Sequence, residues 1–259
     1  MPETAPTAPQ IRAQIVAFSA IALALSAIIA AIAYQLGDEN ITFLVVLSPS
    51  ILAAILTAIY VGKAGLRDLF VHRLFKPIKL SWLLVSLLGI PAIAVLSLLL
   101  NPIFGGAGLK LSGAGLLPQA IVILLISIGE EFGWRGFLLP RLQTRYSALI
   151  ASLILALIWG LWHFPGYLIG VGVPLGVPFA VFMLWVIPMT ILMTWVYNNT
   201  QSILAAIIMH SAANVSFAYL FLLPEITGEI GSFYTLIALS WLAAGIVTFR
   251  YGPTRLQRS

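Results

Sequence analysis

Long apolar stretches, separated by short polar ones, run along most of the chain. A membrane-spanning helix needs about 20 mostly apolar residues, and by that measure the pattern predicts eight spans. They cover roughly residues 13–36, 41–62, 80–101, 116–139, 147–170, 177–197, 201–223 and 230–249. The pattern therefore predicts an all-α membrane protein with about eight transmembrane helices.

The composition supports this prediction, since 61% of the 259 residues are hydrophobic and only 8% are charged. Such a balance excludes an ordinary soluble domain. Residues 1–10 are rich in Pro and polar, so we expect a disordered cytoplasmic tail followed by a single transmembrane domain over 11–259. The first apolar run, of about 24 residues, exceeds the core of a signal peptide, and we expect it to be retained.

The basic residues are distributed asymmetrically over the predicted loops. One side of the predicted membrane collects twelve of the thirteen: Arg12, Lys63, Arg67, Arg73, Lys76, Lys79, Arg135, Arg141, Arg145, Arg250, Arg255 and Arg258. The positive-inside rule places that side, and with it both termini, in the cytoplasm. The net charge of +5 is thus a topology signal, and no nucleic-acid partner is expected.

The apolar spans and the distribution of basic residues predict an integral multi-pass protein that is surrounded by the lipid bilayer. If the source is a prokaryote, this bilayer is the plasma membrane. Residues 64–77 combine an apolar side with basic residues and predict an interfacial helix that faces anionic lipid. His72 is expected to be a solvated surface residue of that helix.

Several catalytic mechanisms are excluded by composition. The chain has no cysteine, which removes thiolate nucleophiles, disulfides and thiolate metal sites. The aspartates, Asp38 and Asp68, both lie outside the spans, so an intramembrane aspartyl pair is absent. No His-Glu-x-x-His string, nucleophile elbow or phosphate-binding loop occurs either. The remaining chemistry is that of Glu, His and Asn.

Charged residues in the fourth span are the main candidates for function. An ionised group at bilayer depth costs at least roughly 2.5–3.5 kcal/mol, so it indicates a functional site. Glu131 and Arg135 are four residues apart on one helical face and are expected to form a structural ion pair. Glu130 points about 100° away from that face. It is therefore free of a local counter-charge and is a candidate general base.

Three spans together bring Glu130 and other polar groups to a similar depth. The polar connection 140–147 makes the fourth and fifth spans an antiparallel hairpin, and Glu130 and His163 are equally far from its midpoint, about 25 Å from the tip. In the seventh span, His210 and Asn214 share one face. We expect these four residues to line one pocket near the cytoplasmic leaflet, open to the cytoplasm. Trp162 is a possible substrate contact on the pocket wall, which we also expect to include Trp134 and Trp159.

The three strings resemble the motifs of a known family, the type II CAAX prenyl proteases and bacteriocin-processing enzymes, also called the abortive-infection family. Its motifs are Glu-Glu-x-x-x-Arg, Phe-x-x-x-His and His-x-x-x-Asn. They are matched here by 130–135, 159–163 and 210–214, with Trp159 in place of the common Phe. The resemblance covers a core of about residues 110–220.

The resemblance implies an intramembrane endopeptidase that acts on a membrane-associated protein or peptide, with prenylated CAAX-type substrates as one option. By the same resemblance, Glu130 aided by His163 activates a water, and His210 with Asn214 stabilises the oxyanion. Glu131 and Arg135 support the site. We favour a mechanism without a cofactor. The alternative is zinc or another divalent metal held by Glu130, His163 and His210.

Two other functions remain open on the sequence alone. Intramembrane Glu and His residues also build proton relays, so a proton-coupled transporter is one alternative. The pattern lacks the paired broken helices in symmetric halves that would support it. The other alternative is a non-catalytic membrane immunity or scaffold protein that keeps the fold and uses the pocket for binding.

Overall fold

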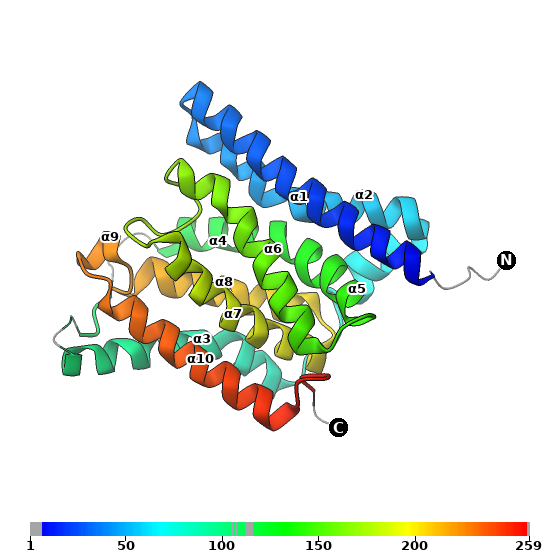
Figure 1. Ribbon diagram of the computed structural model, residues 1–259. Helices are drawn as coiled ribbons and strands as arrows, with labels where there is room; N and C mark the ends of the chain where they lie inside the picture. The colour runs from blue at the N-terminus through cyan, green and yellow to red at the C-terminus, as the bar shows by residue number, and fades with distance from the viewer. Residues whose placement is uncertain (1–6, 105, 107, 112–115, 258–259) are drawn as a thin grey trace.

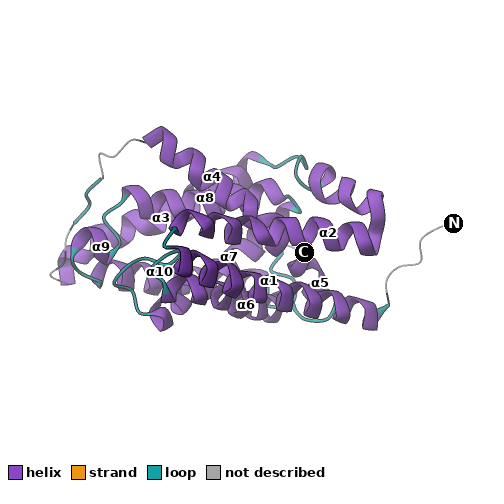
Figure 2. Cartoon of the chain, turned by 90° about the horizontal axis from the view of Figure 1, so that it is seen from above, coloured by secondary structure: helices purple, strands orange, loops and turns teal. Residues whose placement is uncertain are grey.

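The computed structural model describes residues 7–104, 106, 108–111 and 116–257, and the described chain is helical without a strand (Figures 1 and 2). The long helices are α1 (Ala8–Leu36), α2 (Phe43–Arg67), α3 (Leu80–Leu100), α4 (Leu116–Glu131), α6 (Ala148–Leu168), α7 (Phe179–Thr200), α8 (Ile203–Tyr219) and α10 (Gly231–Tyr251). The short helical segments are η1 (Glu39–Thr42), η2 (Asp68–His72), η3 (Asn101–Phe104), η4 (Phe132–Leu138), α5 (Leu139–Gln143) and α9 (Pro224–Thr227).

Six helical stretches in the described chain are long and apolar enough to cross a membrane, and they include α1, α2, α3, α6, α7 and α10. The predicted all-α membrane fold is thereby confirmed. α8 has only 17 residues, and α4 reaches membrane-spanning length only together with η4 and α5. The count of eight spans and the cytoplasmic location of the termini stay predictions.

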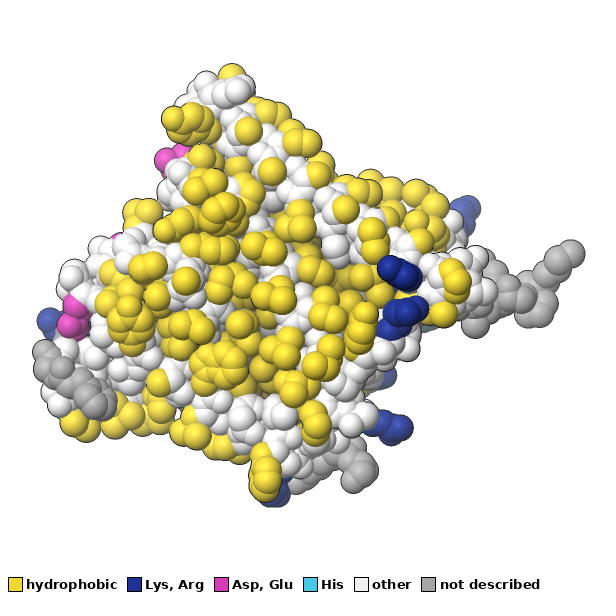
Figure 3. All heavy atoms as spheres, viewed as in Figure 1, with side chains coloured by type: hydrophobic (Ala, Val, Ile, Leu, Met, Phe, Trp, Pro, Cys, Tyr) yellow, Lys and Arg dark blue, Asp and Glu magenta, His cyan; other side chains and the backbone are white. Residues whose placement is uncertain are grey.

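The sides of the helix bundle are largely apolar, whereas the charged residues of the acidic motif lie inside. Large hydrophobic side chains such as Ile28, Ile55, Leu88 and Leu242 are at least half exposed. Figure 3 shows that hydrophobic side chains cover most of the face in view. Glu130, Glu131 and Arg135 are instead at most 3% exposed. This distribution suits a lipid environment, in which polar groups must find partners inside the protein.

The motif-bearing helices form the centre of the bundle. α8 packs against α3, α4 and α7, which explains why this short helix contains many fully buried residues. α6 packs against α7 and α1, and α10 covers α3 and α7. This arrangement holds the three motifs on α4, α6 and α8 in adjacent helices around one interior.

The bundle has two chemically different ends. The basic end carries the start of α1, the segment between α2 and α3, the α5–α6 connection and the end of α10, so both termini lie there (Figure 1). The opposite end, which we call the distal end, carries η1, η3, the loop 169–178 and α9. In Figure 3 most of the visible Lys and Arg side chains gather at the basic end, and the visible acidic ones lie at the distal end.

Two predictions about short segments, the N-terminal tail and the interfacial helix, can be compared with the structure. α1 begins at Ala8, inside the expected tail 1–10, because Thr7 and Gln10 form a reciprocal capping box and Pro9 suits the first turn. Residues 1–6 lie outside the described residues.

The predicted interfacial segment follows a break at Gly62, where φ is 71°. It then continues as the end of α2 and the π-helix η2, on which His72 is exposed.

The C-terminal segment after α10 folds back on the start of α6. The backbone N–H groups of Ala148 and Leu149 donate to the carbonyls of Thr254 and Pro253, at 2.8 and 3.0 Å. Side chains of α7 fix the same segment, since Asn198 donates to the Arg255 carbonyl at 2.7 Å. These bonds supply acceptors for N–H groups that a helix start leaves free.

Glycines on α4 and η4 allow α2 to approach at backbone distance. A Cβ at Gly129 would lie 2.8 Å from the Val46 carbonyl oxygen, and one at Gly133 would lie 2.6 Å from that of Pro49. The Ser50 hydroxyl donates to the Ile128 carbonyl at 2.9 Å across the same interface. Small residues spaced by four are a common basis for such close helix packing in membranes.

We expect Gly133→Ala to destabilise the fold by roughly 1–3 kcal/mol, because the added methyl group overlaps the Pro49 backbone. Thermal unfolding of the purified protein in detergent measures the effect. Gly245→Ala is the matched control, since a Cβ there meets nothing within 4 Å. Equal melting temperatures for the two variants would contradict the close-approach argument.

Candidate active site

The acidic motif lies where α4 changes into a π-helix. Glu130 and Glu131 end α4, and η4 follows from Phe132 to Leu138 with Arg135 at its centre. Such π segments are rare and occur frequently at functional sites. The change in helical winding lets the buried side chains around it contact several neighbouring helices.

Glu130 is held by two tryptophans. Its Oε2 accepts a hydrogen bond from the Trp159 indole at 2.7 Å and another from the Trp134 indole at 3.2 Å. The side chain is buried, with 3% of the residue exposed. Trp134 is four residues along the same helical run, and Trp159 comes from α6. The two donors therefore fix one carboxylate oxygen between two helices.

Glu131 belongs to a separate buried network. Its Oε1 accepts from Arg135 Nη1 at 2.9 Å and lies 2.9 Å from His210 Nδ1. All of Glu131 and Arg135 is inaccessible. The Arg135 guanidinium also lies 4.6 Å from the centre of the Trp159 ring, in cation–π geometry. The predicted ion pair is confirmed, and His210 is an additional partner of it.

Both histidines use Nδ1 to contact the protein. His163 Nδ1 lies 2.8 Å from the Trp159 carbonyl oxygen, and because a carbonyl only accepts, this nitrogen carries the proton. His210 Nδ1 faces the carboxylate of Glu131, which is already paired with Arg135. In each ring, Nε2 is the nitrogen left for another partner.

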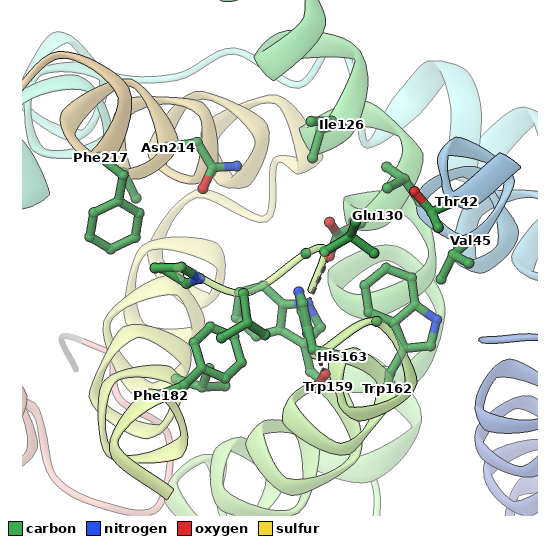
Figure 4. Close-up of a pocket in the computed structure, with 18 of the residues that line it drawn as sticks. Thr42, Val45, Ile126, Glu130, Trp159, Trp162, His163, Phe182, Asn214 and Phe217 are labelled. Carbon is green, nitrogen blue, oxygen red and sulfur yellow. Dashed lines mark hydrogen bonds between the residues drawn. The ribbon is translucent and has the colours of Figure 1, made fainter. Parts of the chain in front are cut away.

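A cavity of about 490 Å³ brings the predicted site residues together. Glu130, His163, His210, Asn214 and Trp162 all line it, and Figure 4 shows Glu130 and Asn214 approaching it from different helices. Aromatic and aliphatic side chains form the rest of the nearby wall; they include Phe182, Phe217, Trp185 and Ile126. Glu131 and Arg135 do not line the cavity and lie behind it.

The direction of the cavity differs from the expectation. We expected an opening toward the basic end, but the lining extends from Glu130 to the distal end, through Thr42, Gly170 and Glu225. The position of Glu130 along the helix does not determine toward which end the cavity opens, because Glu130 lies near the middle of the helical run from Leu116 to Gln143. Toward the basic end, bulky side chains fill the space; they are Trp134, Phe137, Leu138, Leu139 and Leu142, all at most 1% exposed.

Sequence reasoning missed the role of two tryptophans as hydrogen-bond donors. We expected Trp134 and Trp159 to be wall residues, whereas both indoles bond to Glu130. A signal was present for Trp134, which is four residues after Glu130 and so shares its helical face. For Trp159 the available signal was its departure from the family motif, since Phe has no N–H to donate.

The alternative metal site can be tested against the donor geometry. Among the described residues, no three His, Asp or Glu side chains are grouped closely enough to hold a metal ion. The suggested set of Glu130, His163 and His210 is therefore not arranged as a ligand triad. In addition, one oxygen of Glu130 already accepts two indole donors.

Comparison with known proteins assigns the chain to a family. The model of the type II CAAX prenyl endopeptidase Rce1-like family matches residues 112–216, nearly the predicted core. A protein of Methanococcus maripaludis named CAAX prenyl protease 2 is 32% identical over 197 residues, which cover 67% of this chain and 72% of that protein. The chain belongs to the Rce1-like family of type II CAAX prenyl endopeptidases, which are membrane proteases.

Proposed function

We propose that this protein is an intramembrane endopeptidase in which Glu130 activates water to hydrolyse a peptide bond of a membrane-associated protein or peptide. The observation that supports this most directly is the convergence of Glu130, His163, His210 and Asn214 on one cavity. Family membership supports the same reaction class. Among substrates, a prenylated CAAX-type protein is one option, since the relative in Methanococcus maripaludis is named for it.

In the proposed mechanism, Glu130 takes a proton from water as the oxygen attacks the peptide carbonyl. The indole bonds occupy Oε2 and orient the carboxylate, so that Oε1 is the natural proton acceptor. His163 assists through Nε2, because its Nδ1 is engaged by the Trp159 carbonyl. The proton held by Glu130 then passes to the amine nitrogen as the peptide bond breaks.

The negative charge that develops on the carbonyl oxygen during the attack is stabilised by hydrogen-bond donors that are already in position before the reaction. Asn214 supplies amide N–H groups from α8, and His210 lies one helical turn earlier on the same helix. When His210 carries a proton on both nitrogens, Nε2 donates to the oxyanion while Nδ1 donates to Glu131. Glu131 and Arg135 act as positioning residues, since they contact His210 and the Trp159 ring and do not line the cavity.

We expect Glu130→Gln to lower the rate of peptide-bond cleavage by at least about 100-fold, because an amide keeps the hydrogen-bond geometry and loses the base. The measurement is comparative mass spectrometry of membrane peptides from cells with wild-type or variant protein. Glu39→Gln, at an exposed site on η1, is the control. Fragments that persist unchanged with Glu130→Gln would instead support a non-catalytic scaffold or immunity protein.

We expect Trp159→Phe to remain folded and to lower kcat by roughly tenfold, since hydrogen bonds to charged groups contribute about 1.5–3 kcal/mol. Trp195→Phe is the matched control, because the Trp195 indole N–H has no partner among the described residues. A kcat that is unchanged in Trp159→Phe would argue against this positioning role.

We expect a divalent-metal chelator to leave the cleavage rate unchanged, because the site residues are not grouped as a metal ligand set. The same fragment assay, run on membranes incubated with and without the chelator, measures this. Loss of fragments with the chelator, and their return when zinc is added, would support the metal-dependent alternative.

A further inference from the structure

A second cavity lies at the basic end, between the interfacial segment and the junction of η4 with α5. Its volume is about 300 Å³, and it shares no lining residue with the active-site cavity. Two arginines from different elements line it, Arg73 directly after η2 and Arg141 on α5. Asp68 is the one carboxylate among its described lining residues. The cavity therefore carries a net positive charge.

Arg141 is a half-buried cation without an anionic partner. Its Nε donates to the side-chain oxygen of Gln14 at 2.6 Å, and its Nη1 donates to the Phe137 carbonyl at 2.8 Å. Both acceptors are neutral. Within the described chain, Nη2 has no hydrogen-bond partner and no carboxylate forms an ion pair with Arg141. Because burial removes part of its hydration, such a charge is favourable when an anion compensates it.

Arg73 increases the need for an anion in this cavity. Its Nε forms an ion pair with Asp68 at 2.7 Å, and its Nη1 donates to the Gly136 carbonyl at 3.0 Å. Arg73 is also close enough to Arg141 for their like charges to repel each other. A phosphate group can accept from both arginines at once, because each guanidinium presents pairs of N–H donors that match phosphate oxygens.

The surroundings of the cavity favour the phosphate of a lipid over a free phosphate ion. Most other lining side chains are small or apolar; they are Thr57, Val61, Ala64, Gly65 and Leu69. Beside the cavity, the interfacial segment exposes Val71 and Phe75, by 45% and 71%. A segment that presents apolar and basic side chains together suits the boundary between lipid headgroups and acyl chains.

We propose that Arg73 and Arg141 form a binding site for the phosphate of an anionic phospholipid headgroup. The acyl chains of the bound lipid stay in the bilayer, while the headgroup enters the cavity. The site requires only that this end of the bundle lies at a membrane surface, in either leaflet.

The bound lipid would contact the segments that carry the catalytic motifs through the two arginines. Both arginines donate to carbonyls of η4, Arg73 to that of Gly136 and Arg141 to that of Phe137. The Arg73 carbonyl also accepts the Ile203 N–H at the start of α8, at 3.0 Å. A headgroup that neutralises the two cations therefore stabilises the junction of η4 with α8.

The test uses the full-length protein, purified in an uncharged detergent. Phosphatidylglycerol is the anionic lipid, phosphatidylcholine the zwitterionic lipid and inorganic phosphate the free anion. Native mass spectrometry counts the bound lipid, and the melting temperature as a function of ligand concentration gives an apparent Kd. We expect the wild type to retain one phosphatidylglycerol and to show a saturable rise in melting temperature. Phosphatidylcholine and inorganic phosphate are expected not to reproduce this rise at the same concentration.

We expect Arg141→Gln to raise the apparent Kd for phosphatidylglycerol at least tenfold, because it removes the cation that lacks a counter-charge. Arg67→Gln is the matched control, since Arg67 is an exposed arginine of the interfacial segment that does not line the cavity. Ala64→Phe keeps both arginines and fills the cavity from an exposed lining position, so it is expected to weaken binding as well. This variant keeps the test decisive if Arg141→Gln does not fold.

An equal Kd for Arg141→Gln and Arg67→Gln would overturn the proposal, because the attraction would then come from the overall charge of this end. So would the absence of saturable binding by the wild type, or an unchanged Kd in Ala64→Phe. An equal response to inorganic phosphate would overturn the assignment to a lipid and leave a free anion as the ligand. Binding does not require cleavage, so Glu130→Gln is expected to bind phosphatidylglycerol as the wild type does, whatever its effect on activity.

Discussion

The ion pair between Glu131 and Arg135, extended by His210, is the interaction on which the rest of the site depends. It joins the end of α4 and η4 to α8 in an interior where neither charge has access to solvent. Removal of one partner from a buried pair leaves an uncompensated charge, which is strongly destabilising. The pair thus sets the rotation of α4 and η4, and that rotation directs the neighbouring Glu130 to the cavity.

The two adjacent glutamates illustrate how one helix creates two environments. Glu131 faces a cation and an imidazole, whereas Glu130 faces two indole N–H groups and a cavity. Consecutive residues on a helix point about 100° apart, so a single dipeptide serves both structure and chemistry. Arg135 connects the two, because its guanidinium pairs with Glu131 and covers the Trp159 ring that donates to Glu130.

The sequence predicts correctly those features of the site that follow from helical periodicity and from the position of a residue along its helix. The helical spacing identified the Glu131–Arg135 pair, and the symmetry of the hairpin placed Glu130 and His163 beside one cavity. It did not reveal η4, because apolar and small residues surround Arg135 on every side of this segment, so the wider winding leaves no mark in the hydrophobic pattern. It also did not reveal the exit of the cavity, which depends on how side chains such as Phe137 and Leu142 fill the interior. Catalytic roles stay predictions, since geometry alone does not measure a rate.

The return of the C-terminal segment to α6 has a practical consequence for handling the protein. The carbonyls of Pro253 and Thr254 cap the start of α6, the helix that carries Trp159 and His163. Leu256 is fully buried beside them. Truncated variants that stop after α10 would remove these acceptors and free the start of α6 to fray, at the opposite end of the helix from His163. Purification handles and reporter fusions are therefore better attached ahead of α1, where Thr7 and Ala8 are exposed at the surface.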